Sequence, residues 1–203
     1  MPSSSGRTPI ASPPPSTSIS PAAGQSAAVD ICCGAGRGAV VIALARPDAD
    51  VHAVDINDAA LRLTAVNAAL AGATRVRQRR SDLLSTLDGG FDLIVGNPPY
   101  LLDRGKRVYR HGGGGLGECL AKLSPTWPAI VLAPGGALLL YTGSAVVDGV
   151  HRFRAAVMPK LQEDRLEAIE VELDPDVFGE ELLEPAYAEA DRIAAVLVTA
   201  RRP

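Results

Sequence analysis

A glycine-rich turn joins an apolar segment to a helical one near the start of the folded part of the chain. Residues 27–31 are apolar enough for a buried strand, residues 39–45 are typical of a helix, and four of the residues between them are glycine or alanine. Glycines at such a junction let the backbone approach a ligand closely, and the helix N-terminus adds exposed N–H groups. The turn therefore constrains the chain to a strand–turn–helix unit of the kind that builds ligand sites in parallel sheets.

Two carboxylates stand beside this turn. Asp30 lies at the end of the first strand, and Asp55 ends the next apolar strand, 51–54. An acid about twenty residues beyond such a turn can accept hydrogen bonds from ribose hydroxyls. The spacing lacks the three-glycine dinucleotide signature, and a carboxylate at Asp30 repels a pyrophosphate but suits an ammonium group. The pattern therefore argues against NAD and for another ribose-bearing ligand.

A side-chain amide, two prolines and an aromatic ring follow the apolar run 91–96. Asn97 offers one carbonyl acceptor, and a backbone carbonyl freed from strand pairing by Pro98 and Pro99 offers a second. Two acceptors that converge on one NH2 group fix its plane and aim the nitrogen lone pair, while Tyr100 can supply a flat wall. The tetrapeptide predicts alkylation of a weakly nucleophilic nitrogen, and the alternative is an ordinary proline-rich turn.

Together these residues resemble the class I S-adenosylmethionine-dependent methyltransferases. Within that class they look most like the Asn-Pro-Pro-Tyr enzymes that methylate amides and amines, such as the release-factor glutamine methyltransferases. The resemblance spans roughly residues 27 to 201. It implies an enzyme of the EC 2.1.1 type that uses S-adenosyl-L-methionine and no metal. It also implies a Rossmann-like α/β fold, with a seven-stranded, mostly parallel sheet, an antiparallel last strand and helices on both faces.

The resemblance also assigns the site. The first acid and the glycine turn hold the methionine part of the cofactor, the second acid binds ribose, the next residue packs on adenine, and an acid after the third strand binds the adenine amino group. The cofactor-binding residues are then Asp30, Cys32, Gly34, Gly36, Asp55, Ile56, Asp82, Leu83 and Asn97. The catalytic residues are Asn97, Pro98, Pro99 and Tyr100. Cys32 stands where the family usually has its first glycine, so the cofactor must tolerate a small side chain there.

Composition divides the chain into a tail and one domain. Residues 1–26 are dominated by Ser, Pro and Ala, which cannot bury enough apolar surface to offset ordering, so a disordered tail is expected. Residues 27–203 form the expected methyltransferase domain. Release-factor enzymes carry a helical substrate-recognition domain before the catalytic one, and the tail cannot form it. The resemblance therefore carries over the chemistry but leaves the substrate open.

Cysteines, apolar runs and charge indicate a cytoplasmic protein. No apolar stretch approaches the roughly 20 residues that span a bilayer. Three cysteines, two of them adjacent, make neither a disulfide framework nor a zinc site. A net charge of −3 does not recruit polyanions.

Strand and helix patterns alternate along the rest of the chain. Asn57 or Asp58 caps a helix that stops at Gly72. The third strand is expected at 74–78, the fourth at 91–96 and the fifth at 137–142, followed by a helix at 147–161 that Pro159 interrupts. The last two strands are expected at 166–173 and 193–199, as an antiparallel pair at one edge.

Three charged segments have two interpretations each. The first contains Arg104, Lys106, Arg107, Arg110 and His111 before the glycines 112–115, and forms either a basic lip over the pocket or a solvated loop. The second contains Arg75, Arg77, Arg79 and Arg80, and forms either a nucleic-acid stripe or, as we expect, the solvent side of an edge strand. The third, 174–191, has seven acidic residues and is long for a hairpin connection, which indicates a functional insertion or a partly ordered flap.

Four functions fit these residues. The leading hypothesis is an N-methyltransferase that acts on a planar amide or amine nitrogen, most simply a glutamine side chain of a protein. The second is methylation of an exocyclic amine of rRNA or DNA, which the net acidity and the acidic segment disfavour. The third is methylation of a small-molecule amine, and the fourth is a binding module without catalysis. The set Asp55, Asp82 and Asn97 argues against the fourth. No membrane partner is expected.

Overall fold

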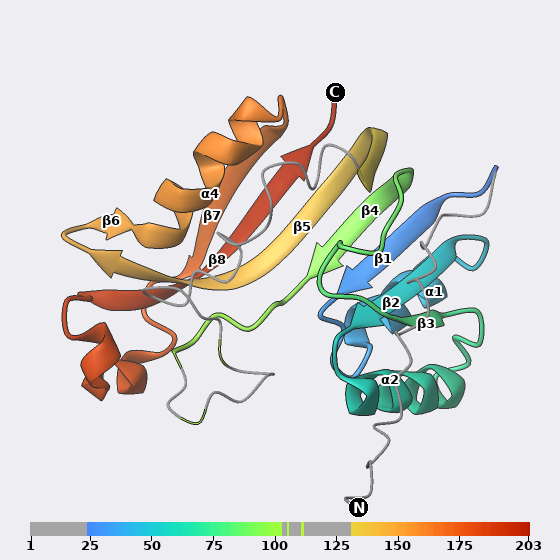
Figure 1. Cartoon of the computed structure of the whole chain (residues 1–203), viewed down its shortest axis with the longest axis horizontal. Coiled ribbons are helices and arrows are strands. Elements are labelled where there is room, and N and C mark those ends of the chain that lie inside the picture. Colours follow the sequence, from blue (N-terminus) through green and yellow to red (C-terminus); the bar gives the residue numbers. More distant parts are fainter. Residues whose placement is uncertain (1–23, 103–104, 106–110, 112–130) are drawn as a thin grey trace, which may run out of the picture.

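The computed structural model, which describes residues 24–102, 105, 111 and 131–203, shows an α/β protein organised around one mixed sheet (Figure 1). Its elements in chain order are β1 (Ala27–Ile31), α1 (Arg37–Ala45), β2 (Asp50–Asp55), α2 (Asp58–Leu70), β3 (Arg77–Arg80), β4 (Phe91–Gly96), β5 (Leu132–Val147), β6 (Val150–His151), α4 (Arg152–Glu163), β7 (Glu167–Asp174), the 3₁₀ helices η2 (Gly179–Leu183) and η3 (Pro185–Tyr187), and β8 (Arg192–Arg201).

The strand order reverses direction beside β1, which marks a usual place for a ligand site at the carboxyl ends of the parallel strands. The strands lie in the order β3-β2-β1-β4-β5-β8-β7, with β6 paired to β5. Strands β1 to β5 pair in parallel, whereas β8 is antiparallel to both β5 and β7. The expected mostly parallel sheet with an antiparallel last strand is therefore confirmed. The chain winds outward from β1 through β2 to β3 and then returns to β4 on the other side of β1. Ligand sites form at the carboxyl ends of strands where the winding reverses in this way.

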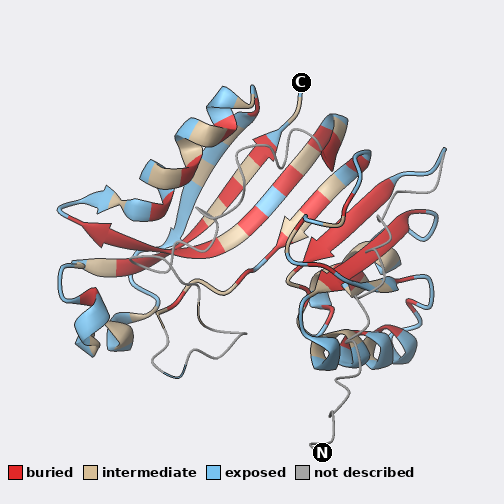
Figure 2. Cartoon of the chain, viewed as in Figure 1, coloured by how far each residue is buried: buried red, intermediate tan, exposed pale blue. Residues whose placement is uncertain are grey.

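The two faces of the sheet pack against different helices. Val51 of β2 clusters with Ala39 of α1 and Ala68 of α2. Ile94 of β4 belongs to a second cluster with Phe153 of α4. Helices therefore cover both faces, as expected. Figure 2 shows that β1 and β2 are buried along almost their whole length, whereas β7 is largely exposed. The best-packed part of the sheet is thus the part that carries the glycine turn.

Helix α2 begins and ends on the residues that the sequence predicts. The side chain of Asn57 accepts the N–H of Ala59 at 3.0 Å, which satisfies one of the unpaired donors of the first turn. The helix ends at Leu70, and Gly72 follows with a φ of 76°, the left-handed conformation that glycine adopts without strain.

Strand β3 begins later than predicted. It covers Arg77–Arg80 rather than residues 74–78, because it must pair with β2, and its partners run from His52 to Asp55. The side chain of Arg75, which precedes the strand, instead donates to the carbonyl of Pro47 at 3.1 Å. β3 ends the sheet on this side, as expected.

The fifth strand and the helix after it also differ from the predicted ranges, 137–142 and 147–161. β5 extends to Val147 because it pairs with β8 along its whole second half, and α4 begins only at Arg152. A turn at Asp148 and Gly149, both with positive φ, makes a short hairpin with β6 where a helix start was expected. Pro159 lies inside α4 and does not interrupt it.

Several expectations lie outside the described residues. They are the tail up to residue 23, the basic residues Arg104, Lys106, Arg107 and Arg110, and the glycines 112–115. His111 is described and forms an isolated parallel bridge with Leu101. Within the described ranges, no helix is long and apolar enough to cross a membrane.

Candidate functional site

The glycine turn between β1 and α1 is held from behind by helix α2. Thr64 donates its hydroxyl to the carbonyl of Gly34 at 3.0 Å, and Asn67 donates its side-chain amide to the carbonyl of Ala35 at 2.9 Å. Gly36 has a φ of 78°, and a Cβ there would lie 2.5 Å from Cγ2 of Thr64. Gly36 is therefore required for the turn to seat on α2.

Two residues on the open side of the turn adopt the left-handed conformation. Gly34 has a φ of 53° and Cys32 a φ of 52°. A non-glycine residue in this region costs about 1–2 kcal/mol, which gives a physical reason for a glycine at position 32 in the family. Cys33 is buried behind the turn, and burial raises the pKa of its thiol to about 12. Cys33 is thus protonated at neutral pH.

Asp55 is oriented by backbone donors on both sides. Its Oδ2 accepts the N–H of Gly34 at 3.0 Å, and its Oδ1 accepts the N–H of Asn57 at 2.9 Å. Each carboxylate oxygen can accept a second hydrogen bond. The two bonds fix the plane of the carboxylate, so it can receive a ligand's hydroxyls without reorganising.

Asp30 is buried at the end of β1, with 5% of its surface exposed. Its Oδ2 accepts the N–H of Ala39 in the first turn of α1 at 2.9 Å. Burial raises the pKa of Asp30 to about 6; the Ala39 N–H lowers it and the charge on Asp55 raises it. A cationic ligand group beside this carboxyl would favour its ionised form.

A cavity of about 600 Å³ opens where β1, β2 and β4 end. Its size lies in the range of small-molecule and cofactor sites. The predicted site residues that line it are Asp30, Cys32, Gly34, Asp55, Ile56, Asn97 and Pro99. Those outside its lining are Gly36, Asp82, Leu83, Pro98 and Tyr100. The structure thus brings the glycine turn, the second carboxylate and the side-chain amide to one cavity, although they are far apart in the sequence.

Asp82 and Leu83 follow β3 next to Asp55. The N–H of Ser81 donates to the carbonyl of Asp55 at 3.1 Å, and the hydroxyl of Ser81 donates to the carbonyl of Leu83 at 2.8 Å. Asp82 is exposed, and Leu83 has a φ of 52°. These bonds anchor the segment beside the second carboxylate.

The turn after β4 presents Asn97 to the cavity. Gly96 ends the strand against Ile31, and a Cβ at Gly96 would lie 2.6 Å from Cγ1 of Ile31. Asn97 is exposed and lines the cavity with Pro99, whereas Pro98 is buried. The close packing at Gly96 therefore sets where the side-chain amide emerges.

Tyr100 packs against β5. A Cβ at Gly143 would lie 2.5 Å from Cδ2 of Tyr100. The centroid of the Tyr100 ring is 5.4 Å from that of Phe178 and 6.3 Å from that of Tyr141. Tyr141 lines the cavity, so the structure supplies an aromatic ring there from β5, not from the tetrapeptide.

Sequence reasoning missed several residues that line the cavity. They include Arg37, Asn57, Val95, Leu139, Tyr141 and Leu197. Val95 and Tyr141 carried a usable signal, because parallel strands converge at their carboxyl ends. Val95 is the last residue but one of β4, and Tyr141 is the last but one of the expected strand 137–142, although β5 itself continues to Val147. Arg37 is the first residue of α1, a usual place for ligand contacts. Leu197 carried none, since β8 runs antiparallel.

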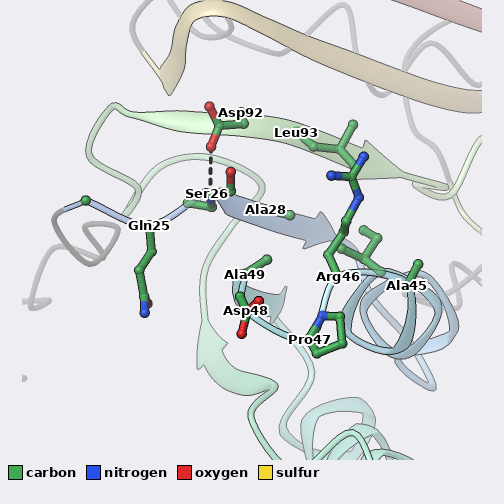
Figure 3. A pocket seen from close by; sticks show the side chains of 13 residues that line it. Gln25, Ser26, Ala28, Ala45, Arg46, Pro47, Asp48, Ala49, Asp92 and Leu93 are labelled. Carbon is green, nitrogen blue, oxygen red and sulfur yellow. Dashed lines mark hydrogen bonds between the residues drawn. The ribbon is translucent and has the colours of Figure 1, made fainter.

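A second cavity of about 620 Å³ lies at the opposite ends of the strands, beside the start of β1 and the end of α1 (Figure 3). Asp92 of β4 accepts the N–H of Ala27 there at 2.8 Å, and Arg46 and Pro47 form part of the rim. None of the predicted site residues lines this cavity.

The arginines of β3 are engaged with neighbouring groups. Arg77 lies 3.3 Å from Asp50, and Arg80 lies 3.0 Å from Asp58. Arg79 donates to the carbonyl of Gln78 at 3.1 Å. These contacts fit the charged solvent side of an edge strand better than a stripe that binds nucleic acid.

Comparison with known proteins finds a family and several relatives that match part of the chain. Residues 18–110 match the family described as the methyltransferase small domain. The chain is 37% identical over 128 residues to the 4-amino-L-phenylalanine/4-methylamino-L-phenylalanine methyltransferase of Streptomyces pristinaespiralis, covering 57% of this chain and 43% of that protein. It is 36% identical over 135 residues to the release factor glutamine methyltransferase of Koribacter versatilis, covering 58% and 47%. The alignments thus span less than half the length of these two relatives.

The fold has solved counterparts. The geranyl diphosphate C-methyltransferase of Streptomyces coelicolor A3(2), solved with S-adenosyl-L-homocysteine, matches with a TM-score of 0.61 at 19% identity, covering 89% of this chain and 76% of that chain. At this identity the likeness shows the fold. The resemblance expected from the sequence motifs is confirmed by the relatives. The partial family match, the relatives and the fold all resemble those of the class I S-adenosylmethionine-dependent methyltransferases, in agreement with the sequence motifs.

Proposed function

We propose that this chain methylates a planar amide nitrogen, most simply the side-chain amide of a glutamine in a protein. The observation that carries the proposal is the position of Asn97, which lines the same cavity as Asp30 and Asp55. Relatives named release factor glutamine methyltransferase and ribosomal protein uL3 glutamine methyltransferase support the choice of glutamine, at 36% and 41% identity. The alignments cover 47% and 25% of those proteins, so the acceptor belongs to the proposal.

The donors and acceptors of the cavity fit the nucleoside half of S-adenosylmethionine. Asp55 has an oxygen available to each ribose hydroxyl, since its own backbone contacts use one lone pair of each. Ile56 lines the cavity beside it and can pack on adenine. Ser81 anchors the segment of Asp82 and Leu83 next to Asp55. In this proposal the segment binds the adenine amino group.

The other end of the cavity fits the methionine half. Asp30 suits the ammonium group, Arg37 suits the carboxylate, and Cys32 and Gly34 bring the backbone close. When bound, the cofactor supplies a methyl group on a positively charged sulfur that is also a good leaving group. The protein's own task is then to hold and orient the acceptor nitrogen.

Asn97 performs that task in this proposal. Its side-chain carbonyl and the carbonyl of Pro98 accept the two hydrogens of the acceptor NH2. These bonds fix the direction of the nitrogen lone pair and favour its use in forming the new bond. The nitrogen that has gained a methyl group carries one proton too many, and that proton is lost to water. Pro98 and Pro99 limit the backbone motion of the turn, so the geometry exists before the acceptor arrives. Tyr141 supplies the aromatic surface of the cavity.

A small-molecule aromatic amine is the second candidate acceptor. The relative that methylates 4-amino-L-phenylalanine, at 37% identity, supports it. An exocyclic amine of a nucleic acid is less well supported, because Arg77 and Arg80 are engaged in ion pairs and the net charge is −3. A cytoplasmic location is part of the proposal, because the relatives are named for a release factor and a ribosomal protein, which act in translation.

The test is to incubate the full chain with methyl-labelled S-adenosylmethionine and a cell extract, and then separate protein, RNA and small molecules. The proposal predicts label in protein, on glutamine after proteolytic digestion. Asn97→Ala should lower the labelling rate by about a hundredfold or more, whereas Gln162→Ala, which removes an exposed amide on α4, should not change it. Label confined to RNA or to small molecules, or Asn97→Ala labelling at the wild-type rate, would contradict the proposal.

A further inference from the structure

The segment 175–191 between β7 and β8, which we call the β7–β8 insertion, folds onto the end of the sheet. It contains η2 and η3 and forms a small apolar cluster with β5 and β8. The buried members are Ala145, Tyr187 and Ile193, and Leu102, Phe178, Leu182 and Ala190 pack around them. Tyr187 is 1% exposed. In Figure 1 the insertion lies below the end of β5, and the chain that leaves β4 runs towards it.

Two aromatic residues of the insertion contact the turn that follows β4. The hydroxyl of Tyr187 accepts the N–H of Leu102 at 2.8 Å, across 85 residues of sequence. The ring of Phe178 lies 5.4 Å from that of Tyr100, between centroids, in a tilted arrangement. The insertion therefore contacts Tyr100 and Leu102, which lie on either side of Leu101 in the segment that follows the two prolines.

These contacts have a short path to Asn97. Tyr100 packs against Phe178 and against Gly143 of β5, where a Cβ would lie 2.5 Å from its ring. Pro98 and Pro99 separate Tyr100 from Asn97, and proline fixes φ near −65°. A displacement of Tyr100 is therefore transmitted along a stiff segment to Asn97, not absorbed by it.

We propose that Tyr187 and Phe178 are positioning residues, which hold the Asn97–Tyr100 turn in the geometry that receives the acceptor nitrogen. The inference rests on the proposed function, because it needs Asn97 to bind the acceptor. Neither residue lines the cavity, so their proposed action on the acceptor goes through the turn. The length of the insertion, which exceeds what a hairpin needs, then has a mechanical reason.

The first test measures the contact without any substrate. Tyr187→Phe keeps the ring and removes the hydroxyl that accepts the Leu102 N–H. In the complex with S-adenosylhomocysteine, hydrogen exchange at Leu102 should be about tenfold faster or more in this variant. Exchange at Val29 in β1 should stay unchanged, which shows that global stability is intact. Unchanged exchange at Leu102 would overturn the proposal.

The second test measures the consequence for transfer. The initial rate of label incorporation into the protein fraction is followed at varied cofactor concentration. Tyr187→Phe and Phe178→Leu should lower the maximal rate about five- to thirtyfold and leave the KM for the cofactor within twofold. Leu183→Ala, in the same insertion but 87% exposed, is the matched control and should behave as wild type.

The outcomes separate the two ideas. Wild type that labels protein, with both variants labelling at its rate, would overturn the positioning role while the proposed function stands. A parallel rise in the cofactor KM and loss of melting temperature in both variants would also overturn it, since a merely structural role predicts that pattern. Wild type that labels no protein would overturn the proposed function, and with it the role of the insertion.

Discussion

The two sides of the cavity that we propose for the cofactor and for the acceptor, here called the cofactor side and the acceptor side, are held in place by different kinds of interaction. On the cofactor side, carboxylate, hydroxyl and amide side chains hold the glycine turn, through bonds such as Thr64 to Gly34 and Gly34 to Asp55. On the acceptor side, packing of aromatic rings holds the turn after β4, and one long-range hydrogen bond joins Leu102 to Tyr187.

The difference indicates which part of the site tolerates substitutions and which part does not. Hydrogen bonds to backbone groups have fixed geometry, so the cofactor side tolerates little change. Aromatic packing tolerates substitutions of similar volume, so the acceptor side can change shape while the fold persists. Loss of cofactor binding and loss of transfer should therefore be separable by mutation.

The largest effects should come from replacing one glycine on each side by alanine, Gly36 on the cofactor side and Gly143 on the acceptor side. A Cβ at Gly36 would lie 2.5 Å from Thr64 in a residue with a φ of 78°, so Gly36→Ala should lower the free energy of unfolding by about 2–4 kcal/mol. A Cβ at Gly143 would lie 2.5 Å from the ring of Tyr100, a residue of the turn on the acceptor side. Gly143→Ala should keep cofactor affinity and lose about tenfold or more in transfer.

Denaturant unfolding and labelling rates check this pair. Gly34→Ala is the control for backbone strain alone, because Gly34 has a positive φ but nothing within 4 Å of its Cβ position. It should cost about 1 kcal/mol. Equal losses of stability at positions 34 and 36 would refute the packing argument, and loss of cofactor affinity in Gly143→Ala would join the two sides that we separate.

The pH dependence of cofactor binding should come next in size. The pKa of Asp30 is raised to about 6, mainly by burial, with Asp55 raising it further. Below that pH the carboxyl gains a proton and loses its attraction for an ammonium group. The affinity for S-adenosylhomocysteine should fall about five- to tenfold between pH 6 and pH 5.

The stability of the free protein should respond in the opposite sense. The folded pKa of Asp30, about 6, lies above the ordinary value of 3.8, so the folded state binds more protons than the unfolded state between these values. Its contribution to stability is then present at low pH and is lost as the pH rises towards 6. Asp30→Asn should remove both pH dependences, and calorimetry at several pH values would show whether it does.

The smallest effect should be a gain at Cys32. Its φ of 52° costs a non-glycine residue about 1–2 kcal/mol, and glycine's greater freedom in the unfolded chain offsets part of that. Cys32→Gly should therefore raise the free energy of unfolding by about 0.5–1 kcal/mol. A lower melting temperature in the variant would show that the Cys32 side chain contributes packing that outweighs its strain.

The cofactor side was predictable from sequence because its parts are local. Asp30, Gly34 and Asp55 lie within one strand–helix–strand unit, and the carboxyl ends of parallel strands must meet. The prediction for Gly36 came from the motif, and the structure adds that a Cβ there would meet Thr64 on α2, a packing contact that no motif encodes.

The acceptor side was predictable only at Asn97. The position of Tyr100 against Gly143 depends on how far β5 extends, and that length is set by pairing with β8 at the far end of the chain. The contact between Leu102 and Tyr187 joins residues 85 apart. The acidic character of the insertion was visible in the sequence. Nothing in the sequence distinguished Phe178 and Tyr187, which pack against the turn, from the other apolar residues of the insertion.

The most direct measurement of the separation between the two sides is calorimetric titration of S-adenosylhomocysteine into two variants in parallel. Asp55→Ala removes the carboxylate that Gly34 and Asn57 orient, and should weaken binding by about 1.5–3 kcal/mol. Asn97→Ala should bind within a few fold of wild type. Asp58→Ala, a neighbouring acid outside the cavity lining, is the control. If Asp55→Ala and Asn97→Ala lose affinity equally, or Asp55→Ala loses none, the division into a cofactor side and an acceptor side is wrong.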